Sequence, residues 1–115
     1  RILLAINVLF SDKMRLPTLI FDEIDSGTSG KIANVIGDLM KKIGYKSQII
    51  AISHLAQVAA KASNHFKVYK ILSSNNPKTQ LRKLNREERI EEIAAMISAD
   101  NITNPALDQA IELLK

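Results

Sequence analysis

An apolar run that ends in two adjacent acids constrains the fold of this chain more than any other feature. Residues 17–27 read Pro-Thr-Leu-Ile-Phe-Asp-Glu-Ile-Asp-Ser-Gly. A short apolar run bounded by proline and Ser-Gly predicts a buried strand of a parallel sheet. Asp22 and Glu23 then lie at the carboxyl end of that strand, where open parallel sheets bind ligands. One acid at such an edge can bind Mg²⁺, while the other orients and deprotonates a water that attacks a nucleotide.

The residues after the acids predict a helix and a second strand. From residue 31 to residue 43, apolar residues recur at helical spacing, and Gly44 follows as a stop signal. The apolar positions are Ile32, Val35, Ile36, Leu39, Met40 and Ile43. Residues 47–53 contain Ile-Ile-Ala-Ile, which predicts a second buried strand. A strand, a helix and a strand in this order predict a right-handed βαβ unit.

The rest of the chain predicts helices and one antiparallel hairpin. Residues 1–13 are mostly apolar and favour a helix, and residues 55–62 favour a short alanine-rich helix. Two predicted strands, at residues 66–72 and 80–84, would form a hairpin with a loose loop.

Two more helices are predicted after the hairpin. Asn85 and Glu88 resemble a capping box that opens a helix to about residue 99, and Pro105 lies near the start of a last helix. Their predicted inner-face positions are Ile90, Ile93, Ala94 and Ile97, then Leu107, Ala110, Ile111 and Leu114.

Composition fits one folded domain and excludes several classes of site. The chain has 115 residues, of which 46% are hydrophobic and 24% charged, and this argues against disorder. Because cysteine is absent, disulfides, thiolate metal sites and cysteine nucleophiles are excluded. The net charge of +4 permits contact with nucleic acid without requiring it.

No apolar run approaches the ~18 residues of a membrane span. The start, Arg1-Ile2-Leu3-Leu4, has no initiator Met, so we interpret the chain as the inside of a longer gene product.

Asp22-Glu23 after the apolar run is a Walker B pattern. Two acids at a strand end can also simply cap the following turn. Asp25 and the small residues at 26–30 favour the functional interpretation, because they let the backbone approach a phosphate or a partner subunit closely. Taken alone, that loop would be a plain strand-to-helix connection.

His54 is the third candidate, since it closes the second predicted strand and should lie beside Glu23. A histidine there can donate to a γ-phosphate oxygen or hold the attacking water, although a lone histidine is more often a turn residue. Gln57 follows about one helical turn later and is a weaker candidate for a polar contact. His65 precedes a strand without other polar signals and is interpreted as structural.

Basic residues concentrate on the predicted hairpin and the helix after it. They are Lys67, Lys70, Lys78, Arg82, Lys83, Arg86 and Arg89. Between residues 67 and 89 only Glu87 and Glu88 oppose them. We interpret this run as a solvated face, with contact to the DNA backbone as the alternative, because Tyr69 is the one aromatic residue interleaved in it.

Two motifs that would define other chemistry are missing. The chain has no Gly-x-x-x-x-Gly-Lys-Ser/Thr phosphate loop, so its acids have no triphosphate cradle of their own. It also has no Gly-x-Ser-x-Gly elbow, which argues against a serine hydrolase.

The stretches 18–30 and 52–57 resemble one family in particular. They read Thr-Leu-Ile-Phe-Asp-Glu-Ile-Asp-Ser-Gly-Thr-Ser-Gly and Ile-Ser-His-Leu-Ala-Gln. Both resemble the C-terminal part of RecN, a family of bacterial DNA-repair ATPases related to SMC proteins. The similarity extends over the whole chain. Residues 1–5 resemble the helix after the ABC signature motif, and residues 85–94 resemble the family's late helix.

The resemblance implies a role for each matching residue. Asp22 would be the Walker B ligand of Mg²⁺, Glu23 the catalytic base and His54 the switch histidine. The D-loop, which crosses to the partner head, would include Asp25, Ser26 and Gly27. The phosphate loop and the signature motif would both precede Arg1, so this chain alone should not hydrolyse ATP.

The resemblance also implies cofactors and partners. They are ATP with Mg²⁺, an N-terminal lobe of the same head, a homodimer of heads and a coiled-coil arm. Function on DNA ends at double-strand breaks, alongside a recombinase, is implied as well, in the cytoplasm near the nucleoid and without a membrane.

We therefore expect an α/β fold, a partial P-loop NTPase lobe of the ABC/SMC head type. It should have a short parallel sheet, flanking helices and a C-terminal β-hairpin, with apolar surface exposed where the other lobe would pack. A helicase DExD box at Asp22-Glu-Ile-Asp25 is one alternative, although such helicases would carry Ser-Ala-Thr where this chain has Ser53-His54-Leu55. A non-catalytic module that grips DNA with its basic hairpin is the other.

Overall fold

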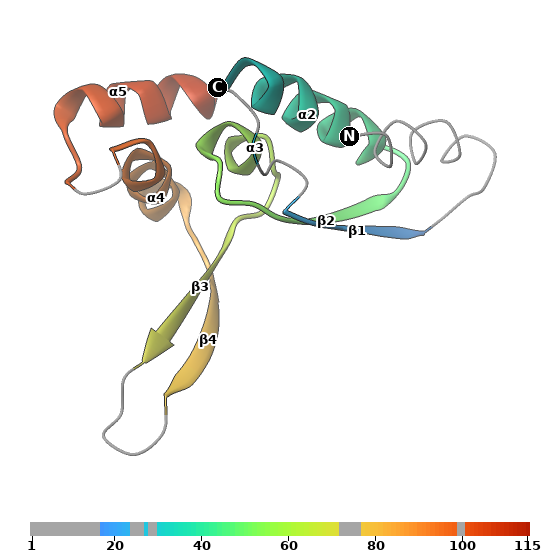
Figure 1. The fold of residues 1–115 in the computed structure, drawn as a ribbon, viewed down its shortest axis with the longest axis horizontal. Helices are drawn as coiled ribbons and strands as arrows, with labels where there is room; N and C mark the ends of the chain where they lie inside the picture. Colours follow the sequence, from blue (N-terminus) through green and yellow to red (C-terminus); the bar gives the residue numbers. More distant parts are fainter. Residues whose placement is uncertain (1–16, 24–26, 28–29, 72–76, 99–100) are drawn as a thin grey trace.

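The computed structural model describes most of the chain after its first sixteen residues. The described residues are 17–23, 27, 30–71, 77–98 and 101–115. Their elements are β1 (Thr18–Asp22), α2 (Gly30–Ile43), β2 (Gln48–Ile52), α3 (Ala56–Ala60), β3 (Phe66–Ile71), β4 (Lys78–Lys83), α4 (Arg86–Ser98) and α5 (Asn104–Leu113) (Figure 1). The helix predicted over residues 1–13 lies outside the described residues. The mixed α/β fold with a short parallel sheet, flanking helices and a hairpin is confirmed.

β1 and β2 form the parallel pair that the sequence predicts, joined by α2. The register runs from Thr18 opposite Gln48 to Asp22 opposite Ile52. A helix between two parallel strands must return the chain to the starting edge, which makes this a βαβ unit. The two strands therefore end at the same edge of the sheet.

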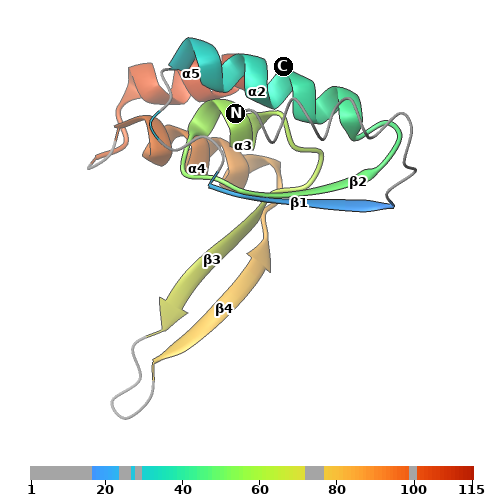
Figure 2. The ribbon, with the colours of Figure 1, turned by 45° about the vertical axis from the view of Figure 1, so that its right-hand side comes forward.

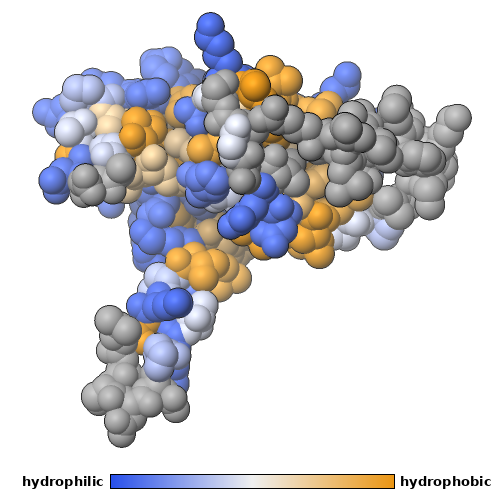
Figure 3. Space-filling model, viewed as in Figure 1, coloured by the Kyte–Doolittle hydropathy of each residue, from blue (hydrophilic) through white to orange (hydrophobic). Residues whose placement is uncertain are grey.

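Only one face of this parallel sheet is covered. Leu19 and Phe21 are buried beneath α2 and α3, which lie on the same side of the sheet (Figure 2). On the other face Ile20, Ile50 and Ile52 are 68%, 44% and 55% exposed. The prediction that both strands are buried is therefore wrong for the described residues, because no described element packs on the second face. Figure 3 shows hydrophobic surface on the body next to this sheet.

α2 packs on the sheet through a narrower stripe than the periodicity predicts. Its large buried residues are Ile36, Met40 and Ile43, with Ala33 completing the stripe. Ile32 and Val35, predicted on the same face, are 41% and 67% exposed, because the two-stranded sheet covers only part of the helix surface. Gly37 permits close contact with α3, since a Cβ there would lie 2.9 Å from Lys61 Cγ.

A second core joins α3, α4 and α5 through small side chains. It consists of Ala56, Ala60, Ile93, Ala94, Ala106 and Ala110. Ile93 is its one large residue that is completely buried, and alanines around it allow the helices to approach closely. Among the described helices, none combines the length and apolarity that crossing a membrane requires.

The caps of α4 and α5 follow from the sequence. Asn85 Oδ1 accepts from the Glu88 backbone N–H, and Glu88 Oε2 accepts from the Asn85 N–H, both at 2.9 Å. This reciprocal pair is the predicted capping box. Thr103 caps α5 by accepting from the Ala106 N–H at 3.3 Å. The inner face of α4 is confirmed, whereas Ile111 of α5 is 42% exposed rather than packed.

β3 and β4 form the predicted hairpin, which projects away from the helices (Figures 1 and 2). Its strands pair from Phe66 opposite Lys83 to Ile71 opposite Lys78. Val68 and Leu81 face each other across the ribbon and are 63% and 65% exposed. A two-stranded ribbon alone is marginally stable, so its base must be supported by the body.

Arg89 joins α4 to the end of α3, the helix that precedes β3. Its Nη2 donates to the backbone oxygens of Ala59 at 3.3 Å and Ala60 at 2.9 Å, and also to Ala62 O. These carbonyls lie at the end of α3, where helical carbonyls lack partners within the helix. The cation also complements the negative end of the helix dipole.

Replacing Arg89 with Met should destabilise the fold. The variant keeps an apolar stem but removes the donor to the carbonyls of Ala59, Ala60 and Ala62, of which Ala59 O still accepts from Ala62 N–H. We therefore expect a loss of about 2 kcal/mol in the free energy of unfolding. Arg86→Met on the exposed first turn of the same helix is the matched control and should change stability by less than about 0.5 kcal/mol. Urea unfolding followed by circular dichroism measures both, and equal losses would refute the capping role.

His65 should make stability depend on pH. Burial, and next the positive charge of Arg89, lower the pKa of His65 below its usual value. The unfolded chain therefore binds the proton more readily, and stability should decrease as the pH falls through about 6.5, the ordinary histidine pKa. His65→Gln should flatten the dependence of the unfolding free energy between pH 8 and pH 5.5, an interval chosen around that value. The same substitution at exposed His54 is the matched control, and an unaltered slope in His65→Gln would contradict the assignment.

Candidate functional site

The two predicted acids lie at the carboxyl end of β1. Asp22 is the last residue of the strand and Glu23 follows it, and both are exposed. Because side chains alternate along a strand, Asp22 shares the uncovered face with Ile20. The acid ends an apolar strand at the rim rather than inside the helix-covered core.

The backbone turns sharply at Glu23. Its N–H donates to Ile52 O at 3.0 Å, which extends the parallel ladder by one bond beyond β1. Its φ is +46°, and among the described non-glycine residues only Glu23 has a positive φ. A non-glycine residue in the left-handed region costs roughly 1 kcal/mol and often marks a functional site. The turn directs the Glu23 side chain differently from a continuing strand.

The loop after the acids is described only at Gly27. Its φ is +67°, a conformation that glycine adopts at little cost, and no atom of the described residues crowds the position of a Cβ. The glycine is therefore needed for its backbone conformation rather than for space. Asp25 and Ser26, the other predicted loop residues, lie outside the described residues.

His54 lies at the same rim as the acids. β2 ends at Ile52, which is both the register partner of Asp22 and the acceptor for Glu23 N–H, and His54 follows two residues later. Ser53 Oγ accepts from Leu55 N–H at 3.0 Å, which shapes the turn that carries His54. The structure thus brings Asp22, Glu23 and His54 to the ends of two adjacent strands.

Gln57 lies next to the start of α2. A Cβ added to Gly30 would be 3.5 Å from Gln57 Nε2, so the amide is close to the first residue of that helix. Gln57 is partly buried on α3. Gln57 therefore lies where α3 meets the start of α2.

The acids fit a magnesium site that a nucleotide would complete. Among the described residues, no three His, Asp or Glu side chains gather as a metal site of their own. Mg²⁺ is usually bound through one or two carboxylates together with phosphates and waters. The carboxylate of Asp22 is exposed at the strand end and could serve as one such ligand.

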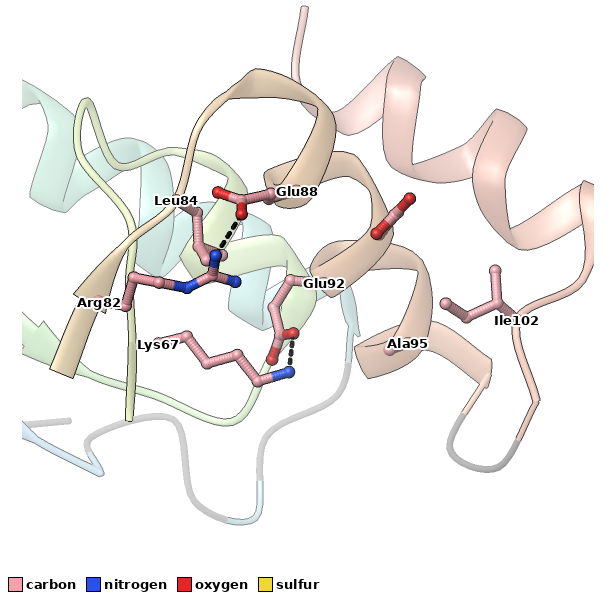
Figure 4. Close-up of a pocket in the computed structure, with 8 residues that line it drawn as sticks. Lys67, Arg82, Leu84, Glu88, Glu92, Ala95 and Ile102 are labelled. Carbon is pink, nitrogen blue, oxygen red and sulfur yellow. Dashed lines mark hydrogen bonds and ion pairs between the residues drawn. The ribbon is translucent and has the colours of Figure 1, made fainter. Parts of the chain in front are cut away.

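The predicted basic surface is divided by ion pairs at the base of the hairpin. Lys67 pairs with Glu92, and Arg82 pairs with Glu88, both acids being on α4 (Figure 4). Arg89 is occupied by the α3 carbonyls. The hydrogen bond from Asn85 N–H, together with Arg82, holds the pKa of Glu88 below its usual value. Part of the run of cations is therefore structural.

Two features of the site were not found from the sequence. The positive φ of Glu23 and the acceptor role of Ile52 O belong to the backbone, and neither side chain signals them. The pairing of the hairpin with α4 had a signal: Glu88 and Glu92 are four residues apart, which places them on one face of a helix.

Curated relatives match the chain over its whole length. It is 41% identical to the DNA repair protein RecN of Haemophilus influenzae over 114 residues, 99% of this chain and 20% of that protein. It is 44% identical to RecN of Rickettsia conorii over 114 residues (99% of this chain, 21% of that protein) and 37% identical to RecN of Bacillus subtilis over 115 residues (100% and 20%). The chain thus spans about a fifth of the length of these relatives. No protein-family model matches it.

Solved structures with a similar fold are heads of SMC ATPases. One comes from work on ATP-driven dimerization and DNA-stimulated activation of SMC ATPases, with a TM-score of 0.63, 20% identity, and coverage of 77% of this chain and 53% of that one. Another is the Smc head domain with a coiled coil and joint from Pyrococcus yayanosii, with a TM-score of 0.63, 22% identity, and coverage of 79% and 16%. These likenesses concern the fold. Over its whole length the chain is similar to RecN proteins, and its fold is similar to part of SMC ATPase heads.

Proposed function

We propose that the chain is the C-terminal part of an ATPase head in a RecN-type DNA repair protein. The placement of Asp22, Glu23 and His54 at the ends of two adjacent parallel strands supports this most directly. Open parallel sheets bind ligands beyond the carboxyl ends of their strands, so a phosphate chain bound there would lie near all three residues. Relatives named as DNA repair proteins supply the biological setting.

Each residue of the rim has a proposed role in ATP hydrolysis. Asp22 holds Mg²⁺, which would neutralise charge on the phosphates when bound. Glu23 accepts a proton from the attacking water, and His54 donates a hydrogen bond to the γ-phosphate. The proposed role of Asp25, Ser26 and Gly27 is to contact the second head of a dimer. The exposure of the acids and of His54 leaves the rim accessible to these ligands.

The remaining parts of the reaction come from outside this chain. Its sequence has no phosphate-loop motif, so ATP must be cradled by an N-terminal lobe of the same head. The exposed face of Ile20, Ile50 and Ile52 gives such a lobe an apolar surface to pack on. On its own the chain should not turn over ATP.

The proposed partners follow from the same assignment. Two heads would close on ATP to form a homodimer, and the whole protein would act on DNA ends at double-strand breaks in the cytoplasm near the nucleoid. A recombinase would work alongside it. A related SMC structure is described in terms of ATP-driven dimerization and DNA stimulation, which agrees with this scheme.

Glu23→Gln should abolish most ATP turnover in the whole gene product. Loss of the general base is expected to reduce the turnover number by about 100-fold or more, because positioned bases contribute 10²–10⁴ in rate. The amide keeps the size of the side chain, so ATP binding should remain. Glu91→Gln on the exposed side of α4 is the matched control. If steady-state phosphate release is unchanged in Glu23→Gln, the assignment of the base is wrong.

Glu23→Gly should leave the chain more stable than Glu23→Ala does, although both changes remove the base. Glycine adopts the φ of +46° at Glu23 without strain, so Glu23→Gly should be more stable than Glu23→Ala by about 1 kcal/mol. Urea unfolding of both variants measures the difference. An alanine variant as stable as the glycine variant would show that the backbone is not held in this conformation.

A further inference from the structure

A cationic pocket lies at the base of the hairpin, away from the rim of the parallel sheet. It has a volume of about 340 Å³ and is formed where the α3–β3 turn meets the β4–α4 turn. Its polar lining includes Ser63, Asn64, His65, Lys83, Arg86 and Arg89. Of the residues that the structure describes, no Asp or Glu lines it. A pocket lined by three cationic side chains and two small polar ones is suited to bind an anion.

The two faces of the hairpin base differ in charge. On one face Arg82 and Lys67 are neutralised by the acids of α4 (Figure 4). Lys83 follows Arg82 along β4, so strand alternation points it to the opposite face. Within the described parts of the chain, neither Lys83 nor Arg86 forms an ion pair. Their charges are therefore available to a ligand.

Nearby acids do not cancel this charge. Glu88 is held by Arg82 and by the Asn85 N–H, on the other side of the helix start. Glu87 is exposed on the first turn of α4 and lies outside the pocket lining. The pocket therefore keeps a positive potential although α4 begins with two acids.

Two buried polar atoms in this pocket's lining residues lack a hydrogen-bond partner, which supports binding of a polar ligand here. Among the described residues, His65 Nδ1 and Arg89 Nε are the buried side-chain atoms without a hydrogen-bond partner. Both residues line this pocket. Buried polar atoms are nearly always satisfied, so orphaned ones commonly mark a bound water or ion.

We propose that this pocket binds a phosphate group through Lys83 and Arg86, with Ser63 and Asn64 as hydrogen-bond donors. A phosphodiester of duplex DNA is one source of that group, and this source rests on the proposed DNA repair function. Free phosphate is the other. In either case the charge on Lys83 and Arg86 binds the anion, while Arg89 fixes the wall of the pocket through the α3 carbonyls.

The test compares two variants with the same change of charge in the whole gene product, without nucleotide. Lys83→Gln/Arg86→Gln removes the pocket cations, and Lys41→Gln/Lys42→Gln removes two exposed cations from the last turn of α2. Fluorescence anisotropy with a labelled 30-bp duplex is recorded over a series of salt concentrations. Amide NMR shifts of Ser63 and Asn64 are followed while inorganic phosphate is added. Arg86→Gln alone serves if the double variant is unstable by thermal unfolding.

The pocket variant should bind the duplex about tenfold more weakly at 0.1 M salt, and its salt slope should fall by about one, as for one lost phosphate contact. The α2 control should change affinity less than about threefold, because remote exposed charges are screened at this salt. A second outcome would support the site with free phosphate as its ligand. In that outcome phosphate causes saturable amide shifts in the unaltered protein but not in the pocket variant, and the two proteins bind DNA equally well. Equal losses in both variants together with no phosphate shifts would overturn the proposal. ATP turnover is not measured here, so failure of the base assignment at Glu23 would be seen separately.

Discussion

The parallel ladder between β1 and β2 is the constraint on which the candidate site depends. Its register places Asp22 opposite Ile52, and the extra bond from Glu23 N–H to Ile52 O carries the pairing past the end of β1. One backbone oxygen therefore fixes the acids relative to the turn that carries His54. Since a shift of one residue would move every side chain to the other face, the rim exists only in this register.

The energetic support for that ladder comes from one side. Leu19 and Phe21 are held by α2 and α3, while Ile20, Ile50 and Ile52 remain exposed on the other face. A monomer rarely leaves a contiguous apolar sheet face uncovered, so this face has the character of an interface. The candidate site thus lies at the end of a sheet that helices cover on one face and that exposes apolar side chains on the other.

The sequence predicted elements well and burial less well. Gly44, the Asn85–Glu88 box and the Ile93–Ala94 face carry local signals, and each appears as expected. The exposure of Ile32 and Val35 could not be predicted, because periodicity shows an apolar face but not how wide a surface will cover it. The φ of Glu23 could not be predicted either, since a glutamate gives no sign of a left-handed backbone. Asp25 and Ser26 remain predictions from the sequence.

A run of basic residues likewise does not define a uniform surface. Consecutive residues of β4 point to opposite faces, so Arg82 meets Glu88 of α4 while Lys83 faces the pocket beside Arg86. The same helix supplies the acids that neutralise one face and the cations that enrich the other. Strand alternation thus divides one run of basic residues between the ion pairs with α4 and the anion pocket. The ion pairs with α4 orient the hairpin, and the orientation of the hairpin in turn sets the position of Lys83 in the pocket.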